Sequence, residues 1–139
     1  MKTQPTFSKI EVGAEIPALV KRPTTQQLVM WAGASGDYNP IHYDTAFALS
    51  RGLPGVVVHG QLSTAFLCQV LSDWYGQKGS LKKINVSYKG LSFPGDTLTC
   101  RGIVKDKSAA DNLVTLDIWV ENQKGEKTVT GTAVVLLSD

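Results

Sequence analysis

The sequence contains few of the features that would assign it to a protein class at once. Its 139 residues include only two cysteines, Cys68 and Cys100, too few for a disulfide framework and typical of small buried residues in a reducing cytoplasm. No apolar run is long enough to span a membrane, and the first residues lack the apolar core of a signal peptide. The net charge is only +2 and the lysines are scattered. We therefore expect a cytoplasmic protein that binds neither nucleic acid nor membrane.

Cofactor motifs and metal ligands are also scarce. The sequence has no phosphate-binding loop and no dinucleotide fingerprint. His42 and His59 are its only histidines, so any imidazole chemistry must use one of them. Together with Asp44 they have the composition of an iron site with two histidines and one carboxylate, but no supporting motif accompanies them. We predict no metal and no cofactor.

The sequence does contain the composition of an ordinary globular protein, with 42% hydrophobic and 19% charged residues. Its length suits a single domain over residues 1–139. A capping signal at Thr24 predicts a helix that ends at Gly36, and Asp44 predicts a second, short helix. The longest helical pattern runs from about Gln61 to Trp74. Because this pattern is apolar over most of its circumference, we expect a helix that is buried on most sides.

After Gly79 the hydrophobic period changes to two, which is typical of strands. The alternating apolar positions fall in four stretches: 84–88, 98–104, 114–120 and 129–137. We predict four strands in antiparallel succession, a further β-like run at 55–58, and core positions for the tryptophans Trp31, Trp74 and Trp119. The order of elements indicates an α+β fold in which a curved antiparallel sheet wraps around the long helix. Pairing of exposed sheet edges between two copies predicts a homodimer.

Residues 36–44 (GDYNPIHYD) are the most informative stretch of the chain. Proline restricts its own φ and the conformation of the preceding residue, so the segment from Asp37 to His42 is stiffer than its length implies. A stiff loop can hold a carboxylate and an imidazole at a fixed separation, where they can bind and polarise one water molecule. The residues alone leave a second interpretation open, in which Asp37 caps a turn and His42 is structural.

A second candidate element is Val58-His59-Gly60, directly before the longest helical pattern. The N-terminus of a helix presents free N–H groups and a partial positive charge, which stabilise negative charge on a carbonyl oxygen. Glycine at this point lets a ligand approach the backbone closely. An ordinary tight junction into the helix is the alternative that these residues leave open.

Residues 35–42 (SGDYNPIH) closely resemble the signature of the MaoC-like dehydratase family, which includes (R)-specific enoyl-CoA hydratases and (3R)-hydroxyacyl-ACP dehydratases. Residues 58–60 are similar to the second hallmark of that family, and residues 93–98 (FPGDTL) to a later turn. The resemblance covers nearly the whole chain. It implies the hot dog fold, usually dimeric, and a hydro-lyase that reversibly hydrates trans-2-enoyl thioesters of coenzyme A or acyl carrier protein to (R)-3-hydroxyacyl thioesters.

The resemblance also implies roles for individual residues. Asp37 and His42 correspond to the family's catalytic pair, Asp37 as the base and His42 as the group that orients the water. The backbone N–H of Gly60 would polarise the thioester carbonyl, and Asn39-Pro40 would support the loop. Two departures from the family pattern, Gln61 after His-Gly and Cys68 farther along the helix, are candidates for the substrate channel.

Two other functions compete with this hypothesis. A hot dog thioesterase would need a carboxylate on the central helix to direct water at the carbonyl, and this helix has no acid before Asp73, near its far end. A non-catalytic partner subunit would have no reason to keep both Asp37 and His42.

Overall fold

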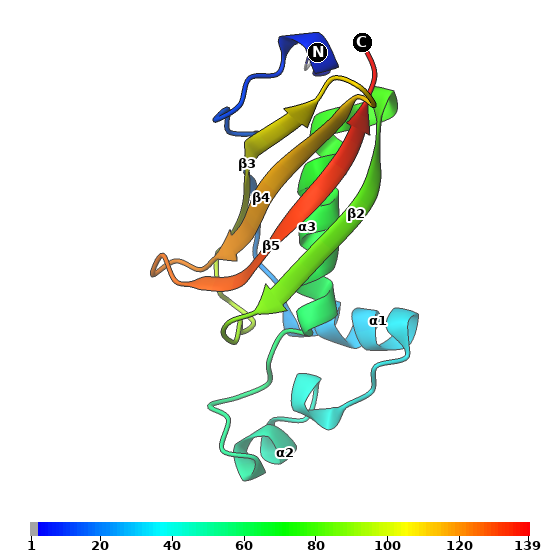
Figure 1. Ribbon diagram of the computed structural model, residues 1–139. Helices are drawn as coiled ribbons and strands as arrows, with labels where there is room; N and C mark the ends of the chain where they lie inside the picture. Colours follow the sequence, from blue (N-terminus) through cyan, green and yellow to red (C-terminus); the bar gives the residue numbers. More distant parts are fainter. Residues whose placement is uncertain (1–2) are drawn as a thin grey trace.

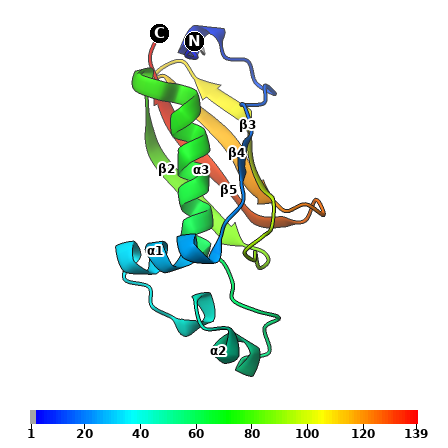
Figure 2. The ribbon, with the colours of Figure 1, turned by 180° about the vertical axis from the view of Figure 1, so that it is seen from behind.

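The computed structural model describes residues 3–139, which form a five-stranded antiparallel sheet curved around one long helix, α3 (Figure 1). The helical elements are η1 (Phe7–Lys9), α1 (Thr25–Ser35), η2 (Pro40–His42), α2 (Thr45–Ser50), α3 (Gly60–Tyr75) and η3 (Gly76–Lys78). The strands are β1 (Leu19–Lys21), β2 (Gly79–Tyr88), β3 (Leu98–Ser108), β4 (Leu113–Glu121) and β5 (Lys127–Leu137). Figure 2 shows α3 lying along one face of the sheet, with α1 near its N-terminal end and α2 beyond α1. The predicted α+β hot dog architecture is confirmed.

The order of strands in the sheet, β1-β3-β4-β5-β2, differs from the predicted succession in the partner of β2 and in the additional short strand β1, which pairs with β3. β3, β4 and β5 do follow one another as antiparallel neighbours, but β2 pairs with β5 at the far edge and not with β3. The connection from β2 to β3 therefore crosses the sheet. Local alternation predicts that a strand exists, whereas its partner is chosen by long-range packing that this pattern does not contain.

The core lies between α3 and the face of the sheet that it covers. Along β4 the residues Val114, Leu116, Ile118 and Val120 are buried, and they alternate with more exposed residues. Trp119 belongs to the alternate set and lies on the outer face, so its predicted core position is wrong; Trp31 and Trp74 pack against the core. The period of two already required this, because successive strand residues point to opposite faces.

The helix boundaries follow the predicted capping residues. The Thr24 side chain accepts a hydrogen bond from the N–H of Gln27 at 3.2 Å, and Asp44 accepts one from Phe47 at 3.1 Å. Gly36 ends α1 with a φ of 79°, a left-handed conformation that favours glycine. Within residues 3–139, no helix combines the length and hydrophobicity that crossing a membrane requires.

The predicted β-like run at 55–58 is wrong for the described chain, because this segment is an extended loop outside every strand of the sheet. Its backbone groups bond to other loops: the N–H of Val57 donates to Ile41 O at 3.0 Å, and the N–H of Val58 donates to Ser92 O at 2.8 Å. The first bond holds the residues before α3 against the segment that carries His42, and the second holds them against the loop that contains Ser92.

Candidate active site

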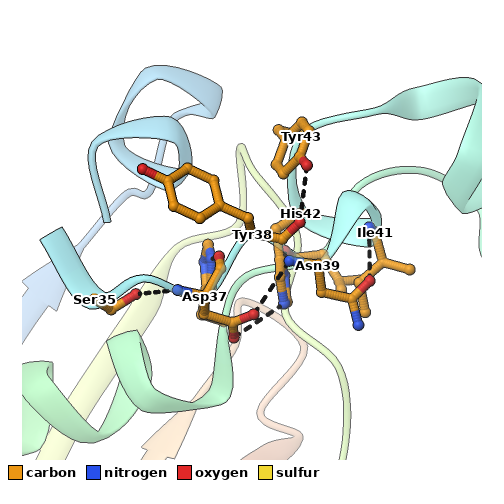
Figure 3. Close-up of polar contacts among 9 residues, drawn as sticks. Ser35, Asp37, Tyr38, Asn39, Ile41, His42 and Tyr43 are labelled. Carbon is orange, nitrogen blue, oxygen red and sulfur yellow. Dashed lines mark hydrogen bonds and ion pairs between the residues drawn. The ribbon is translucent and has the colours of Figure 1, made fainter. Parts of the chain in front are cut away.

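The loop between α1 and η2 is held by a series of hydrogen bonds between residues two apart in the sequence (Figure 3). The N–H of Asp37 donates to Ser35 Oγ at 3.1 Å, and the N–H of Asn39 donates to Asp37 Oδ1 at 3.2 Å. The Asn39 side chain then accepts a bond from the N–H of Ile41 at 3.3 Å, and Pro40 opens the 3-10 turn that ends at His42. Side chains of Asp and Asn that bond to the backbone two residues ahead stabilise turns. The loop is therefore as stiff as its Asn-Pro sequence suggests.

His42 is held in one orientation and one protonation pattern. Its side chain is buried, and Nδ1 lies 2.7 Å from the carbonyl oxygen of Val57. A carbonyl can only accept, so Nδ1 carries the proton and, in the neutral ring, Nε2 carries the lone pair. Nε2 lies 3.8 Å from Asp37 Oδ2, beyond direct hydrogen-bond range. One water molecule can donate to both atoms at this separation, because both are acceptors.

His59 lies directly against this pair, which the sequence alone did not indicate. The imidazole rings of His42 and His59 are stacked, with centroids 3.7 Å apart and planes 17° from parallel. His59 Nε2 lies 3.3 Å from the main-chain oxygen of Asp37, so it donates to that oxygen. Burial lowers the pKa of His59, and the charge of His42 lowers it further, while the carbonyl and carboxylate of Asp37 act in the opposite direction.

The same three residues are the candidate metal ligands of the described chain. One potential ligand atom from each of Asp37, His42 and His59 lies within 4.8 Å of the others. Imidazole nitrogens bind metals through lone pairs in the ring plane, and two stacked rings direct those lone pairs side by side, so one ion cannot lie in both planes. The stacking therefore disfavours a metal centre here. The absence of a metal stays a prediction.

The N-terminus of α3 supplies two unbonded N–H groups. The oxygen of His59 accepts bonds from Leu62 and Ser63, at 3.1 and 3.3 Å, whereas the N–H groups of Gly60 and Gln61 make no hydrogen bond with any residue of the described chain. Such groups carry the partial positive charge of the helix terminus. They are therefore available to a ligand.

The side chain of Tyr88 covers Gly60 from the edge strand β2. A Cβ atom at position 60 would lie 2.9 Å from Tyr88 Cε1, too close for an ordinary contact. The Tyr88 hydroxyl lies 2.9 Å from Thr64 Oγ1, which in turn donates to Gly60 O at 3.3 Å. Only glycine allows the ring to approach this closely, so Tyr88 and Thr64 belong to the site although the sequence did not indicate them.

These groups surround a pocket of about 390 Å³ at the N-terminus of α3. Its polar lining includes Asp37, His42, Gly60, Gln61 and Ser63, and its apolar lining includes Ile41, Val57, Val58, Leu91 and Val129. The loop and the helix N-terminus, predicted separately, thus meet at one pocket. The described lining of this pocket does not include Asn39 and Pro40, which lie in the loop, or Cys68, which lies two turns beyond Gln61 on α3.

Comparisons with known proteins agree with this geometry. The family model described as "MaoC like domain" matches residues 8–133. The (R)-specific enoyl-CoA hydratase of Aeromonas caviae is 33% identical over 129 residues, which cover 92% of this chain and 96% of that hydratase. The solved (R)-hydratase from A. caviae, described as involved in PHA biosynthesis, has a TM-score of 0.88 at 31% identity, over 93% of this chain and 98% of that one.

A third relative forms part of a complex. The ChsH1–ChsH2 complex from Mycobacterium tuberculosis contains a chain that matches with a TM-score of 0.84 at 26% identity, over 91% of this chain and 98% of that one. The likeness therefore extends over the sheet, α3 and the loop that carries Asp37 and His42.

Proposed function

The chain belongs to the MaoC-like domain family, and from this premise we propose that it is a hydro-lyase. It adds water reversibly to trans-2-enoyl thioesters and forms (R)-3-hydroxyacyl thioesters. The observation that carries the proposal is the 3.8 Å separation between Asp37 Oδ2 and His42 Nε2, beside the free N–H groups of the α3 N-terminus.

The water molecule is bound between Asp37 and His42. Both groups accept, so each takes one O–H of the water and the lone pairs of its oxygen remain directed into the pocket. Asp37 acts as the base that removes a proton as the oxygen attacks C3 of the enoyl group. His42 orients the water. A positioned acid–base group of this kind contributes about 10²- to 10⁴-fold in rate.

The N–H of Gly60 stabilises the charge that this attack creates. When the oxygen bonds to C3, the C2–C3 π electrons move toward C2 and onto the thioester oxygen. A helix N-terminus stabilises that oxyanion without reorganisation. Delivery of the proton to C2 then completes the addition, and the reverse sequence is dehydration. No cofactor enters either direction.

Gln61 and Cys68 are proposed to line the path of the acyl chain, since they share one face of α3. Burial raises the pKa of the Cys68 thiol, so the thiol is neutral and compatible with an apolar chain. Replacing Cys68 by leucine should narrow that path and reduce activity on long enoyl chains more than on crotonyl-CoA. Ser72→Leu, at an exposed position one turn further along α3, is the matched control. An equal loss for all chain lengths would contradict the assignment of Cys68.

We also propose that the chain is a single domain and acts as a cytoplasmic homodimer. β2 lies at the end of the sheet, and its outer edge pairs with no strand of residues 3–139, although the strand is ten residues long. Exposed edges of this length are usually covered. Light scattering should give a mass near twice 15.0 kDa. A monomer at catalytic concentrations would contradict the dimer and leave the hydratase proposal intact.

The test of the activity is a hydration assay with trans-2-enoyl-CoAs from crotonyl-CoA to hexadecenoyl-CoA. Loss of enoyl-thioester absorbance, with (R)-3-hydroxyacyl-CoA as the product in chiral analysis, is the expected result. Acyl carrier protein thioesters of the same chains decide between the two carriers. Release of free thiol without hydration would identify a thioesterase instead, and no turnover of any chain would favour a non-catalytic subunit.

A further inference from the structure

His59 touches both members of the Asp37–His42 pair. Its Nε2 donates to the main-chain oxygen of Asp37 at 3.3 Å, and its ring lies face to face with that of His42 at 3.7 Å. Its own side chain is completely buried, with 0% exposed. A rigid ring in this position fixes the backbone of Asp37 and the plane of the His42 ring.

His59 itself cannot exchange protons with a substrate. Its neighbours Val58 and Gly60 line the pocket, but His59 does not contribute to the described lining. Because Nε2 donates to a carbonyl, Nδ1 is the unprotonated nitrogen of the neutral ring, and it has no hydrogen-bond partner among residues 3–139. Protonating it would bury an unpaired N–H and place a positive charge against the ring of His42. The ring is therefore a neutral support.

We propose that His59 is a positioning residue, which holds Asp37 and His42 at the separation that a shared water molecule requires. The inference rests on the proposed hydratase function for its catalytic consequence, but the geometric role is independent of it. His59 also directly precedes Gly60, so one residue connects the loop, the imidazole and the N–H groups at the start of α3. Misplacing a reacting group by about 1 Å costs of the order of 10²-fold in rate.

Three substitutions separate the two contacts. His59→Phe keeps a ring against His42 and removes the donor to Asp37, His59→Gln keeps a donor and removes the ring, and His59→Leu removes both. We expect kcat to fall by about 10²-fold in His59→Leu and by less in the other two, with KM little changed. Trp31→Phe is the matched control, because Trp31 Nε1 is also buried without a partner in the described chain. It should leave kcat unchanged.

The positioning role predicts that effects at His59 depend on Asp37. In an Asp37→Asn background, His59→Leu should cost little further activity, since the base whose position it fixes is already absent. A full and independent loss in that background would mean that His59 acts only through general stability, and would overturn the proposal. Unchanged kcat in all three folded single variants would overturn it as well.

A second readout does not need activity. Replacing His59 leaves His42 as the only histidine, so its Nδ1 proton can be assigned without ambiguity by NMR. We expect a slowly exchanging Nδ1 proton in His59→Phe and fast exchange in His59→Leu. Equal protection in both would overturn the proposal even if the wild type were inactive. An inactive wild type with this contrast preserved would refute the hydratase function alone.

Discussion

Two hollows of this protein, one on the outer face of the sheet and one at the start of α3, differ in a way that separates size from chemistry. The larger, about 630 Å³, lies on the face of the sheet turned away from α3, and its lining includes Ile103, Trp119 and Thr132. The smaller, about 390 Å³, lies at the N-terminus of α3. Volume alone would favour the first as the site of function.

Two of the polar groups that line the outer hollow, Trp119 and Lys127, already interact with neighbouring residues of the sheet. Lys127 lies 4.6 Å from the centre of the Trp119 ring, Trp119 Nε1 donates to Glu121 at 3.2 Å, and Glu121 also pairs with Arg101. In the inner pocket, a carboxylate and an imidazole face each other without bonding, beside two unbonded N–H groups. Groups left without a partner cost folding free energy, so a pocket that keeps them has them available for a ligand.

Removing either acceptor of the water should produce the largest effect. Asp37→Asn keeps the shape of the side chain, and His42→Asn keeps a donor near Val57 O while removing Nε2. We expect each to lower kcat for hydration of crotonyl-CoA by at least about 10²-fold. Thermal unfolding of both variants should stay close to that of the wild type. Wild-type activity in both folded variants would show that the inner pocket is not the site of catalysis.

Gly60→Ala should have the next largest effect, because the new methyl group would meet the ring of Tyr88. Combining it with Tyr88→Ala separates two causes. If the methyl group only displaces the ring, the double variant behaves like Tyr88→Ala alone. If it blocks the approach of the thioester to the N–H, kcat remains low in both backgrounds, by up to about 10²-fold. We expect the second outcome. Full recovery of kcat in the double variant would show that the N–H of Gly60 does not bind the thioester.

Trp119→Phe tests the outer hollow. The change removes the bond to Glu121 and keeps an aromatic ring beneath Lys127, so the free energy of unfolding should fall by about 0.5–1.5 kcal/mol. Hydration kinetics should not change. Urea denaturation and steady-state assays of the same preparation measure the two quantities. A selective rise in KM for acyl-CoA would show that the larger hollow binds substrate after all.

The smallest effect is a pH dependence of stability that belongs to His59. Its pKa is lowered in the folded state from the ordinary value of 6.5, so as the pH falls below that value the unfolded chain binds the proton first. This contribution is therefore complete above about pH 6.5 and is lost as the pH falls toward the folded pKa. His59→Phe should flatten the stability profile as the pH falls below about 6.5, the ordinary pKa of histidine. An equal slope in both proteins would contradict a neutral buried His59.

Much of the fold could be predicted because local chemistry determines it. Thr24, Gly36 and Asp44 mark helix boundaries through bonds or φ values that involve only adjacent residues, and alternation marks the strands. The pairing of β2 with β5 could not be predicted, since pairing partners are set by packing between residues far apart in the chain. The run at 55–58 resembles a strand in sequence because its valines are buried, but its N–H groups bond to loops and not to the sheet.

The same distinction between local signals and long-range packing applies to the site. The loop from Asp37 to His42 and the helix start at Gly60 each have local sequence signals, and their meeting at one pocket is a tertiary fact. The stacking of His59 on His42 and the position of Tyr88 over Gly60 depend on segments that are distant in sequence. The outer position of Trp119 is local, since it alternates with the buried residues Ile118 and Val120 of β4.

The most direct test is a crystal structure of Asp37→Asn with crotonyl-CoA, because this variant should bind the substrate and turn it over slowly. We predict the thioester oxygen about 2.7–3.1 Å from the nitrogen of Gly60, with C3 facing position 37 and His42 Nε2. A thioester bound in the outer hollow, or a carbonyl directed away from the α3 N-terminus, would contradict the central claim.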